Sequence, residues 1–231
     1  MRVLAIDIGG TNVKILATGA KEPRRFPSGP GLTPKKMVAG VKEMAADWKY
    51  DAIAIGYPGQ VRDGRIVTEP RNLGKGWGRF DFKSAFGRPV RIMNDAAMQA
   101  LGSYERGLLL FLGLGTGLGA ALVADGVVIP MELGRLSFKD GTYEDYLGVR
   151  ALERLGRKKW QKYVAFGTAR MIQAVLPDDV VLGGGNAKRL KKLPKGCRLG
   201  NNANAFLGGF RMWDNVSGGQ APTRRKRRRA A

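Results

Sequence analysis

Two short stretches of the sequence place glycine and threonine between apolar residues, in a pattern that suits phosphate binding. Residues 5–17 read AIDIGGTNVKILA and residues 111–123 read FLGLGTGLGAALV. Each predicts a strand, a tight turn and a second strand. Glycine lets backbone N–H groups approach an anion because it has no Cβ, and the hydroxyls of Thr11 and Thr116 could add donors. One such turn could equally be an ordinary β-hairpin, but two in matched register suggest two halves that close on one polyphosphate.

The two turns differ at a position that could serve a metal ion. The first stretch carries Asp7 where the second carries Gly113. Mg²⁺ prefers oxygen ligands and is usually held by one or two carboxylates together with phosphate oxygens and water. We therefore expect Asp7 to serve a Mg²⁺ ion, through phosphate or water. Other phosphate signatures do not fit, because the chain has no G-x-x-x-x-G-K-[ST] segment and the glycines at 113–119 alternate.

Asp95 is the candidate for proton transfer. It follows a predicted strand at 90–93 and precedes a predicted helix at 96–104, and open α/β sheets keep their sites at such strand ends. Transfer of a phosphoryl group to a hydroxyl needs a group that takes or orients the proton. The chain has no histidine, so a carboxylate must do this. The alternative interpretation is that Asp95 is the N-cap of the following helix.

The rest of the pattern alternates strands and helices around these residues. A Thr33-Pro34 pair starts one helix, an Asp63-Gly64 turn joins two short strands, and GGGN at 183–186 opens another helix. Further strands are expected at 2–7, 13–18, 51–55, 127–131 and 179–182, and further helices at 142–154, 162–176 and 204–213.

Composition limits the classes of protein that fit. A chain of 231 residues can bury one sizeable core or two modest ones, and the repeated hairpin favours two lobes. The single cysteine, Cys197, and the absence of histidine exclude a disulfide framework and argue against a zinc site. No apolar run approaches the roughly twenty residues of a membrane span, and the first strand begins without a signal-like segment. We expect a cytoplasmic protein with no membrane partner.

The charge is strongly positive and predicts a polyanionic partner. The chain has 40 Lys and Arg and 19 Asp and Glu, a formal net charge of +21. Six of the basic residues form the run RRKRRR at 224–229, within a tail from residue 215 that we expect to be disordered. Nucleic acid, an acidic membrane surface and inorganic polyphosphate all remain candidates on charge alone.

Four motifs in order resemble the ROK family of sugar kinases. They are DIGGTNVK at 7–14, IMNDAAMQA at 92–100, GLGTGLGAALV at 113–123 and VVLGGGN at 180–186. The chain is most similar to the polyphosphate glucokinase branch, which lacks the family's zinc loop. The resemblance implies an α/β, actin/hexokinase-like fold with two ribonuclease-H-like lobes around a central cleft. We expect lobes at 1–95 and 96–214, with the last helix possibly packing on the first lobe, and a basic tail at 215–231.

The resemblance also implies roles for the motif residues. Asp95 matches the family's catalytic aspartate. The phosphate-binding residues would be Asp7, Gly9, Gly10, Thr11, Lys14, Gly115, Thr116 and Gly117, and the residues near the adenosine or the rest of the donor would be Gly183, Gly184, Gly185, Asn186 and Lys188.

The sugar contacts implied by the resemblance include one departure from the family. The expected set is Gly59, Asn72, Asn94, Asp95, Glu132, Arg135 and Glu144. The family motif is E-x-G-H, but the chain has Arg135 in place of the histidine. Arginine is always charged and only donates, so it could bind a sugar hydroxyl or select a different or acidic sugar. Glu144 could instead be an exposed acid in the first turn of a helix.

We favour polyphosphate as the donor, with ATP as a possible second donor. Two basic clusters could form a track for a long anion, although each could also be a solvated helix face. They are Arg157, Lys158, Lys159 and Lys162, and Lys188, Arg189, Lys191, Lys192, Lys195 and Arg198. We expect a homodimer, with nucleic acid contacted only through Arg224–Arg229. The alternatives are an ATP-only ROK kinase with another sugar specificity and a non-catalytic ROK-like protein that senses sugar or binds nucleic acid.

Overall fold

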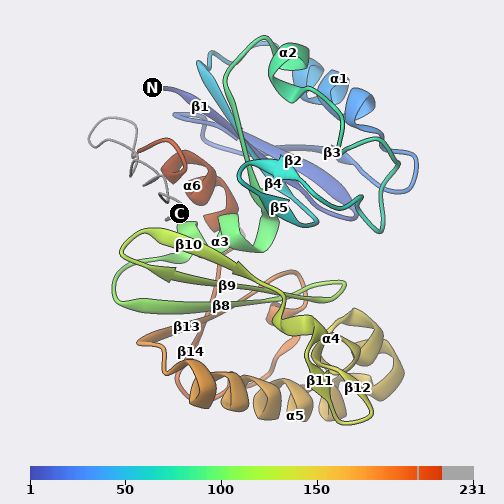
Figure 1. Cartoon of the computed structure of the whole chain (residues 1–231), viewed down its shortest axis with the longest axis vertical. Helices are drawn as coiled ribbons and strands as arrows, with labels where there is room; N and C mark the ends of the chain where they lie inside the picture. Colours follow the sequence, from blue (N-terminus) through green and yellow to red (C-terminus); the bar gives the residue numbers. More distant parts are fainter. Residues whose placement is uncertain (202, 215–231) are drawn as a thin grey trace, which may run out of the picture.

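Two five-stranded sheets with the same strand order form two stacked lobes (Figure 1). The computed structural model describes residues 1–201 and 203–214, so the predicted tail and its arginine run lie outside the described residues. The order is β3-β2-β1-β4-β7 in the first lobe and β10-β9-β8-β13-β14 in the second. The repeat seen in the two glycine stretches therefore extends to whole sheets.

The first lobe begins with the hairpin that carries the first glycine turn. Its strands are β1 (Val3–Ile8), β2 (Asn12–Ala17), β3 (Arg24–Pro27), β4 (Ala52–Tyr57) and β7 (Val90–Asn94). The first three are antiparallel, whereas β4 and β7 add in parallel to β1. A small hairpin, β5 (Val61–Arg62) and β6 (Arg65–Ile66), and two helices, α1 (Pro34–Met44) and α2 (Phe82–Phe86), complete this lobe. As predicted, Thr33 caps α1 and Pro34 begins it.

The second lobe repeats this plan and adds a long helix. Its strands are β8 (Leu108–Leu114), β9 (Leu118–Ala124), β10 (Val127–Met131), β13 (Asp179–Gly183) and β14 (Cys197–Leu199). Between β10 and β13 lie the turn η1 (Leu133–Arg135), the hairpin β11 (Ser137–Phe138) and β12 (Gly141–Thr142), and the helices α4 (Tyr143–Leu147) and α5 (Val149–Val175). A short turn, η2 (Ala187–Arg189), follows β13.

The two glycine hairpins are similar but not in matched register. In the first, Ile8 pairs with Val13 and leaves four residues in the turn. In the second, Leu114 pairs with Leu118 and leaves three. The predicted register is therefore wrong by one residue, because the first turn is longer.

Two helices lie between the sheets and join the lobes (Figure 1). They are α3 (Asp95–Ser103) and α6 (Asn204–Arg211). Their backbones touch through glycine, since a Cβ on Gly102 would lie 1.8 Å from the Asn204 carbonyl oxygen. Helix α6 also packs on the first sheet, where a Cβ on Gly209 would lie 2.7 Å from that of Ala5. The last helix of the chain thus contacts the first lobe.

Two helix predictions in the second lobe agree with the structure only in part. The predicted break at 155–161 is present at Gly156, whose φ is +70°, but the helix resumes directly after it and not at the predicted residue 162. Trp160 anchors this segment because it is buried and donates to the Leu147 carbonyl at 2.9 Å. The GGGN run opens only the three-residue turn η2. Pro194 and Gly196 follow closely and leave no room for a longer helix.

Across the described residues, we find no helix with the length and apolar composition that a membrane crossing requires.

Candidate functional site

A cleft of about 510 Å³ brings both glycine turns together with Asp95. The first lobe contributes Gly10, the segment after β4 and the loop at 68–73. The second lobe contributes the turn at 115–117 and residues of η1 and α4. Twelve of the sequence-predicted site residues line this cleft: Gly10, Gly59, Asn72, Asn94, Asp95, Gly115, Thr116, Gly117, Glu132, Arg135, Glu144 and Gly184.

The other predicted residues lie beside the cleft rather than on its wall. Asp7 and Lys14 face each other across the β1–β2 pair, behind the first turn. Thr11 is exposed, and Gly9 is held in the turn by a bond from its N–H to the Asn12 carbonyl. Gly183, Gly185, Asn186 and Lys188 surround Gly184, which alone of that loop lines the cleft.

Asp95 is positioned by the junction of β7 and α3. Asn94 is the N-cap of α3, and its Oδ1 accepts from the Ala97 N–H at 3.1 Å. The Asn94 amide also donates to the Gly59 carbonyl at 3.1 Å, which fixes the cap to the segment after β4. Asp95 is the first helical residue, and its Oδ1 accepts from the Ala96 N–H at 2.7 Å. The alternative that Asp95 is the N-cap is therefore wrong, because Asn94 holds that position. The second carboxylate oxygen of Asp95, Oδ2, can accept a proton.

The surroundings of Asp95 favour its protonated form. Part of the residue faces the cleft, but protein surrounds the carboxyl group, and this burial raises its pKa to about 7. The value of about 7 also includes repulsion from the carboxylates of Asp7 and Glu132, which raises the pKa, and the bond from the Ala96 N–H, which lowers it. A carboxylate with a pKa near neutrality is suited to accept a proton.

Asp7 is the sequence-predicted carboxylate for a magnesium ion. It is buried, and its carboxylate lies 3.8 Å from the Lys14 ammonium. Burial raises its pKa, and Lys14 opposes that shift. The described residues contain no group of three or more histidine, cysteine or acidic side chains that could hold a metal ion. A Mg²⁺ ion that used Asp7 would take phosphate oxygens and water as its other ligands, which is the usual arrangement for this ion.

The loop after β13 holds the second glycine turn. The Asn186 side chain donates to the Gly115 carbonyl at 3.1 Å, and its N–H donates to the Leu114 carbonyl at 3.0 Å. Gly184 has a φ of +81°, and a Cβ there would lie 2.6 Å from the Leu114 oxygen, so only glycine fits. The GGGN motif thus supports the shape of the turn from behind.

Two contacts cross the cleft between the lobes, and sequence reasoning missed both. Arg71 of the first lobe donates to Glu144 of the second at 3.1 Å, and Gln60 donates to Glu132 at 3.2 Å. The Arg135 guanidinium also pairs with Glu132 at 3.0 Å. Arg71 precedes Asn72 and Gln60 follows Gly59, so their proximity to motif residues was the only available signal. Their partners are more than seventy positions away in the chain.

A carboxylate organises the loop that carries Arg71 and Asn72. The Glu69 side chain accepts from three consecutive backbone N–H groups, those of Gly76, Trp77 and Gly78, at 3.0 to 3.3 Å. Trp77 is buried, which fixes the loop to the core. Asn72 then lies against the first glycine turn, with its Nδ2 3.8 Å from the place of a Cβ on Gly10.

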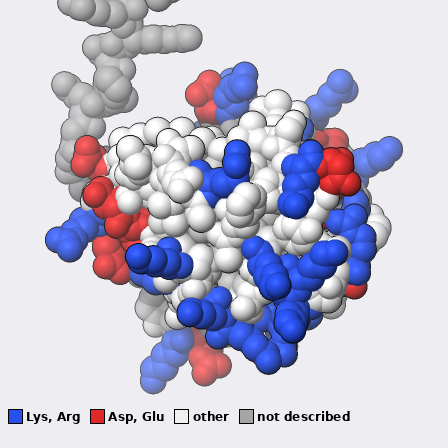
Figure 2. All heavy atoms as spheres, turned by 90° about the horizontal axis from the view of Figure 1, so that it is seen from below, with Lys and Arg blue, Asp and Glu red and all other residues white. Residues whose placement is uncertain are grey.

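The two predicted basic clusters adjoin. The Lys191 N–H donates to the Gln161 side chain at 2.8 Å, which joins the segment after η2 to α5. Figure 2 looks from below onto the second lobe and shows Lys and Arg side chains gathered on this face. We call the residues of both clusters the basic surface. Its η2 end adjoins the loop that carries Gly184, at the edge of the cleft.

Comparison with known proteins identifies a family and related kinases. A family model described as ROK family matches residues 3–134. The polyphosphate glucokinase of Mycobacterium tuberculosis is 27% identical over 209 residues, which cover 81% of this chain and 78% of that protein. A glucokinase of Pyrobaculum calidifontis is 26% identical over 136 residues, which cover 55% of this chain and 45% of that protein.

Solved structures share the fold. The inorganic polyphosphate/ATP-glucomannokinase of Arthrobacter sp. strain KM has a TM-score of 0.78 at 24% identity, with 90% of this chain and 96% of that chain covered. A ROK family glucokinase of Streptomyces griseus, in complex with glucose and AMPPNP, has a TM-score of 0.73 at 17% identity, with 90% and 98% covered. The predicted actin/hexokinase-like fold and the resemblance to polyphosphate glucokinases are confirmed.

Proposed function

This chain belongs to the ROK family, and we propose that it transfers a phosphoryl group from inorganic polyphosphate, ATP or both to a glucose-like hexose, giving a hexose 6-phosphate. The observation that carries the proposal is the position of Asp95, a carboxylate with a raised pKa in a cleft lined by two glycine turns. Relatives named polyphosphate glucokinase and glucokinase support the class of reaction.

Asp95 would act as the base. The sugar hydroxyl gives its proton to the Asp95 carboxylate as its oxygen forms a bond to phosphorus, and the bond between phosphorus and the donor oxygen breaks. The pKa of Asp95, about 7, lies near neutral pH, where a general base is most effective. Asn94 would hold Asp95 in place, because its cap bond fixes the start of α3.

The two turns would bind the phosphates from opposite sides. Gly10 comes from the first lobe, and Gly115, Thr116 and Gly117 come from the second. Gly10 and Thr116 are exposed, so their backbone N–H groups and the Thr116 hydroxyl suit phosphate oxygens, whereas the Gly115 N–H is bonded to the Gly113 and Gly117 carbonyls. Asp7 would hold Mg²⁺, which when bound neutralises charge on the transferring group.

The charges at the sugar side favour an uncharged acceptor. Glu132 is paired with Arg135, and Glu144 is paired with Arg71. Because each carboxylate has a cationic partner, neither arginine is a free cation for an acidic sugar. The carboxylates keep acceptor capacity for sugar hydroxyls. Of the two roles that the sequence leaves open for Arg135, this pairing supports the one in a neutral hexose site.

The basic surface supports polyphosphate as a donor. A linear polyanion gains from many cations at once, whereas ATP needs only the turns, Mg²⁺ and an adenosine site. Lys188 and Arg189 lie in η2, next to the loop that lines the donor side of the cleft. The expected homodimer stays a prediction that sedimentation of the purified protein would test.

A matrix of donors and sugars tests the proposed function. Purified full-length protein is incubated with polyphosphate or ATP, Mg²⁺ and each of several neutral and acidic hexoses, and the sugar phosphate is detected by ³¹P NMR. We expect phosphorylation of a glucose-like neutral hexose and none of the acidic sugars. Absence of sugar phosphate with either donor and every sugar would contradict the proposal.

A further inference from the structure

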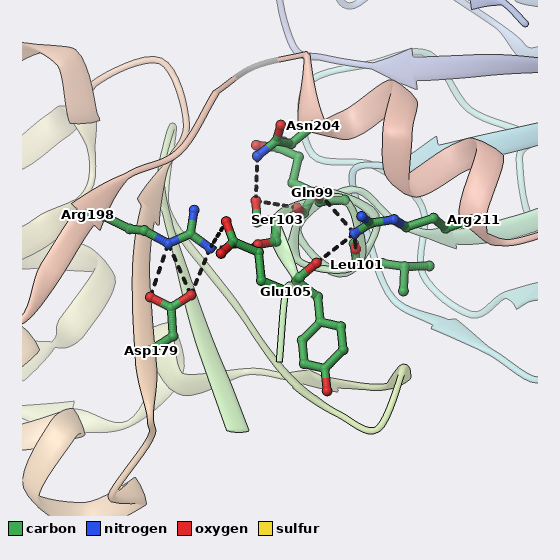
Figure 3. Close-up of polar contacts among 10 residues, drawn as sticks. Gln99, Leu101, Ser103, Glu105, Asp179, Arg198, Asn204 and Arg211 are labelled. Atoms are coloured by element: carbon green, nitrogen blue, oxygen red, sulfur yellow. Dashed lines mark hydrogen bonds and ion pairs between the residues drawn. The ribbon is translucent and has the colours of Figure 1, made fainter. Parts of the chain in front are cut away.

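Helix α3 carries Asp95 at one end and is held by arginines at the other. The Arg211 guanidinium of α6 donates to three carbonyls there, those of Leu101 at 2.7 Å, Gly102 at 3.3 Å and Tyr104 at 2.8 Å. Figure 3 shows Arg211 reaching this end of α3 from one side and Arg198 from the other. Arg198 donates to the Ser103 carbonyl at 2.7 Å.

These contacts satisfy groups that a helix leaves unpaired. The last carbonyls of an α-helix have no partner within the helix, and the helix dipole makes that end negative. A guanidinium offers several donors in a fixed plane and keeps its charge. Arg211 therefore fixes both the position and the rotation of this end of α3, rather than touching it at a single atom.

The partners of α3 are themselves anchored to both sheets. Arg198 forms a bidentate pair with Asp179 at the start of β13, at 2.7 to 3.1 Å. The end of α6 is held by Arg91 of β7, which donates to the Met212 carbonyl and lies 4.4 Å from the Trp213 ring. Strand β7 leads directly into Asp95 at the start of α3. Each of α3, α6 and β7 is therefore joined to the other two.

The opposite end of α3 packs against strands of both sheets. A Cβ on Gly119 of β9 would lie 2.8 Å from that of Ala96. A Cβ on Gly56 of β4 would lie 2.4 Å from the Met98 side chain and 3.6 Å from Cα of Asp95. Both lobes therefore touch the first turn of α3, and a tilt of the helix must move Asp95 relative to both.

We propose that Arg211 is a positioning residue for the transfer reaction: its contacts with the last carbonyls of α3 set the placement of Asp95 at the other end of that helix. The inference rests on the proposed function. It concerns a part of the chain beyond residue 134, where the family match ends.

The length of α3 makes the effect measurable. Nine residues rise about 13 Å along a helix axis, so a tilt of about 5° displaces the far end by about 1 Å. A displacement of that size at a reacting group can cost about a hundredfold in rate.

The test compares R211Q with R211K and with R88Q, in the full-length protein. Arg88 is an exposed arginine after α2 that does not line the cleft, and it controls for the loss of one positive charge. kcat and KM are measured for sugar and donor, together with the thermal midpoint of unfolding. We expect R211Q to lower kcat about 10- to 100-fold with sugar KM within about twofold of wild type. R211K should lose less, and R88Q should match wild type.

A double variant separates positioning of Asp95 from a general loss of structure. If Arg211 acts through Asp95, then D95N/R211Q transfers no more than about twofold slower than D95N, because the residue to be positioned is already disabled. A further loss of tenfold or more in the double variant overturns the inference, as does a folded R211Q with wild-type kcat.

Two outcomes remain to be distinguished. If R211Q does not fold, R211K decides, and a kcat within twofold of wild type in that variant overturns the inference. If the wild-type chain itself transfers no phosphoryl group, the proposed function and the inference both fall. An active wild type with an unaffected R211Q leaves the proposed function standing and removes the inference alone.

Discussion

Asp95 must be ionised to accept a proton, yet its surroundings oppose ionisation. Burial and the carboxylates of Asp7 and Glu132 raise its pKa from an ordinary value near 3.8 to about 7. Between these two values the folded protein binds this proton and the unfolded chain does not. Stability therefore falls as the pH rises through this window, which is the reverse of the usual behaviour of an aspartate.

The first prediction concerns the pH dependence of transfer. Only the carboxylate form of Asp95 can take the sugar proton, so kcat/KM for the sugar, which reports the free enzyme, should rise with pH and reach half its plateau near pH 7. The measurement is kcat/KM for the sugar between pH 5 and 9. A kcat/KM that stays at its plateau down to pH 5 would show that Asp95 is not the titrating base.

The second prediction concerns stability. D95N removes the cost of ionising a buried acid, so the variant should be more stable than wild type at pH 8, by a few kcal/mol at most. The difference should shrink towards pH 4.5, where wild-type Asp95 is protonated in the folded state. Thermal unfolding at both pH values checks this, with E153Q, a change of an exposed acid on α5, as control. A D95N variant that is less stable at pH 8 would refute the assigned environment.

The third prediction concerns sugar selectivity. Arg135 pairs with Glu132, so R135H would free a carboxylate oxygen for a sugar hydroxyl. We expect the kcat/KM ratio of glucose over other neutral hexoses to rise severalfold. An unchanged profile would show that this position does not decide selectivity. Activity with a panel of hexoses is the measurement.

At the scale of elements, the sequence predicts helix starts, tight turns and strands where residues close in the chain determine them. Thr33 and Pro34 indicate the start of α1, and the predicted Asp63-Gly64 turn has a positive φ at both residues. The strand that ends at Asp95 was also predicted, because its apolar run and the following helix are local features. The predicted division of the lobes at residue 95 stays a prediction.

The errors arise where tertiary contacts override local pattern. The charged segment at 155–161 predicts a break, and Gly156 provides one, but the rest of the segment is helical because buried Trp160 bonds to the Leu147 carbonyl of α4. The GGGN run predicts a helix start, but the Asn186 side chain donates to the Gly115 carbonyl of the second glycine turn. The contacts Arg71–Glu144 and Gln60–Glu132 join distant positions, and no pattern within either segment indicates them.

The fourth prediction tests the crossing of α3 and α6. A Cβ on Gly102 would lie 1.8 Å from the Asn204 carbonyl oxygen. That oxygen belongs to the backbone of α6, so the clash can be relieved only by moving one helix away from the other. G102A should therefore destabilise the protein by at least about 1–3 kcal/mol. G31A is the matched control, because nothing lies within 4 Å of a Cβ there. Chemical denaturation of both variants measures the difference, and equal stability would contradict the observed helix crossing.

At the scale of the whole molecule, the position of the charge bears on the choice of donor. From Asn186 to Trp213 the sequence contains no acidic residue, and α5 contains seven basic residues and one acid. The basic surface therefore has few internal partners that would neutralise it. A field of this kind attracts a polyanion at low salt and weakens as salt increases.

The fifth prediction uses that surface to separate the two donors. Neutral replacements at Lys188, Arg189, Lys191 and Lys192 should raise the KM for polyphosphate about tenfold or more and the KM for ATP much less. Wild-type KM for polyphosphate should also rise more steeply with salt than KM for ATP. Deletion of residues 224–229 is the control and should change either KM by less than about twofold. Equal losses for both donors would indicate an ATP-dependent kinase.

The most direct test of the account is the rate of phosphoryl transfer by D95N beside that of wild type. Asparagine keeps the shape of the side chain and can still accept from the Ala96 N–H, but it cannot take the sugar proton. We predict a loss of about a hundredfold to ten-thousandfold in kcat, with sugar binding by calorimetry unchanged. Turnover by D95N within a few-fold of wild type would remove Asp95 from the mechanism and contradict the central claim.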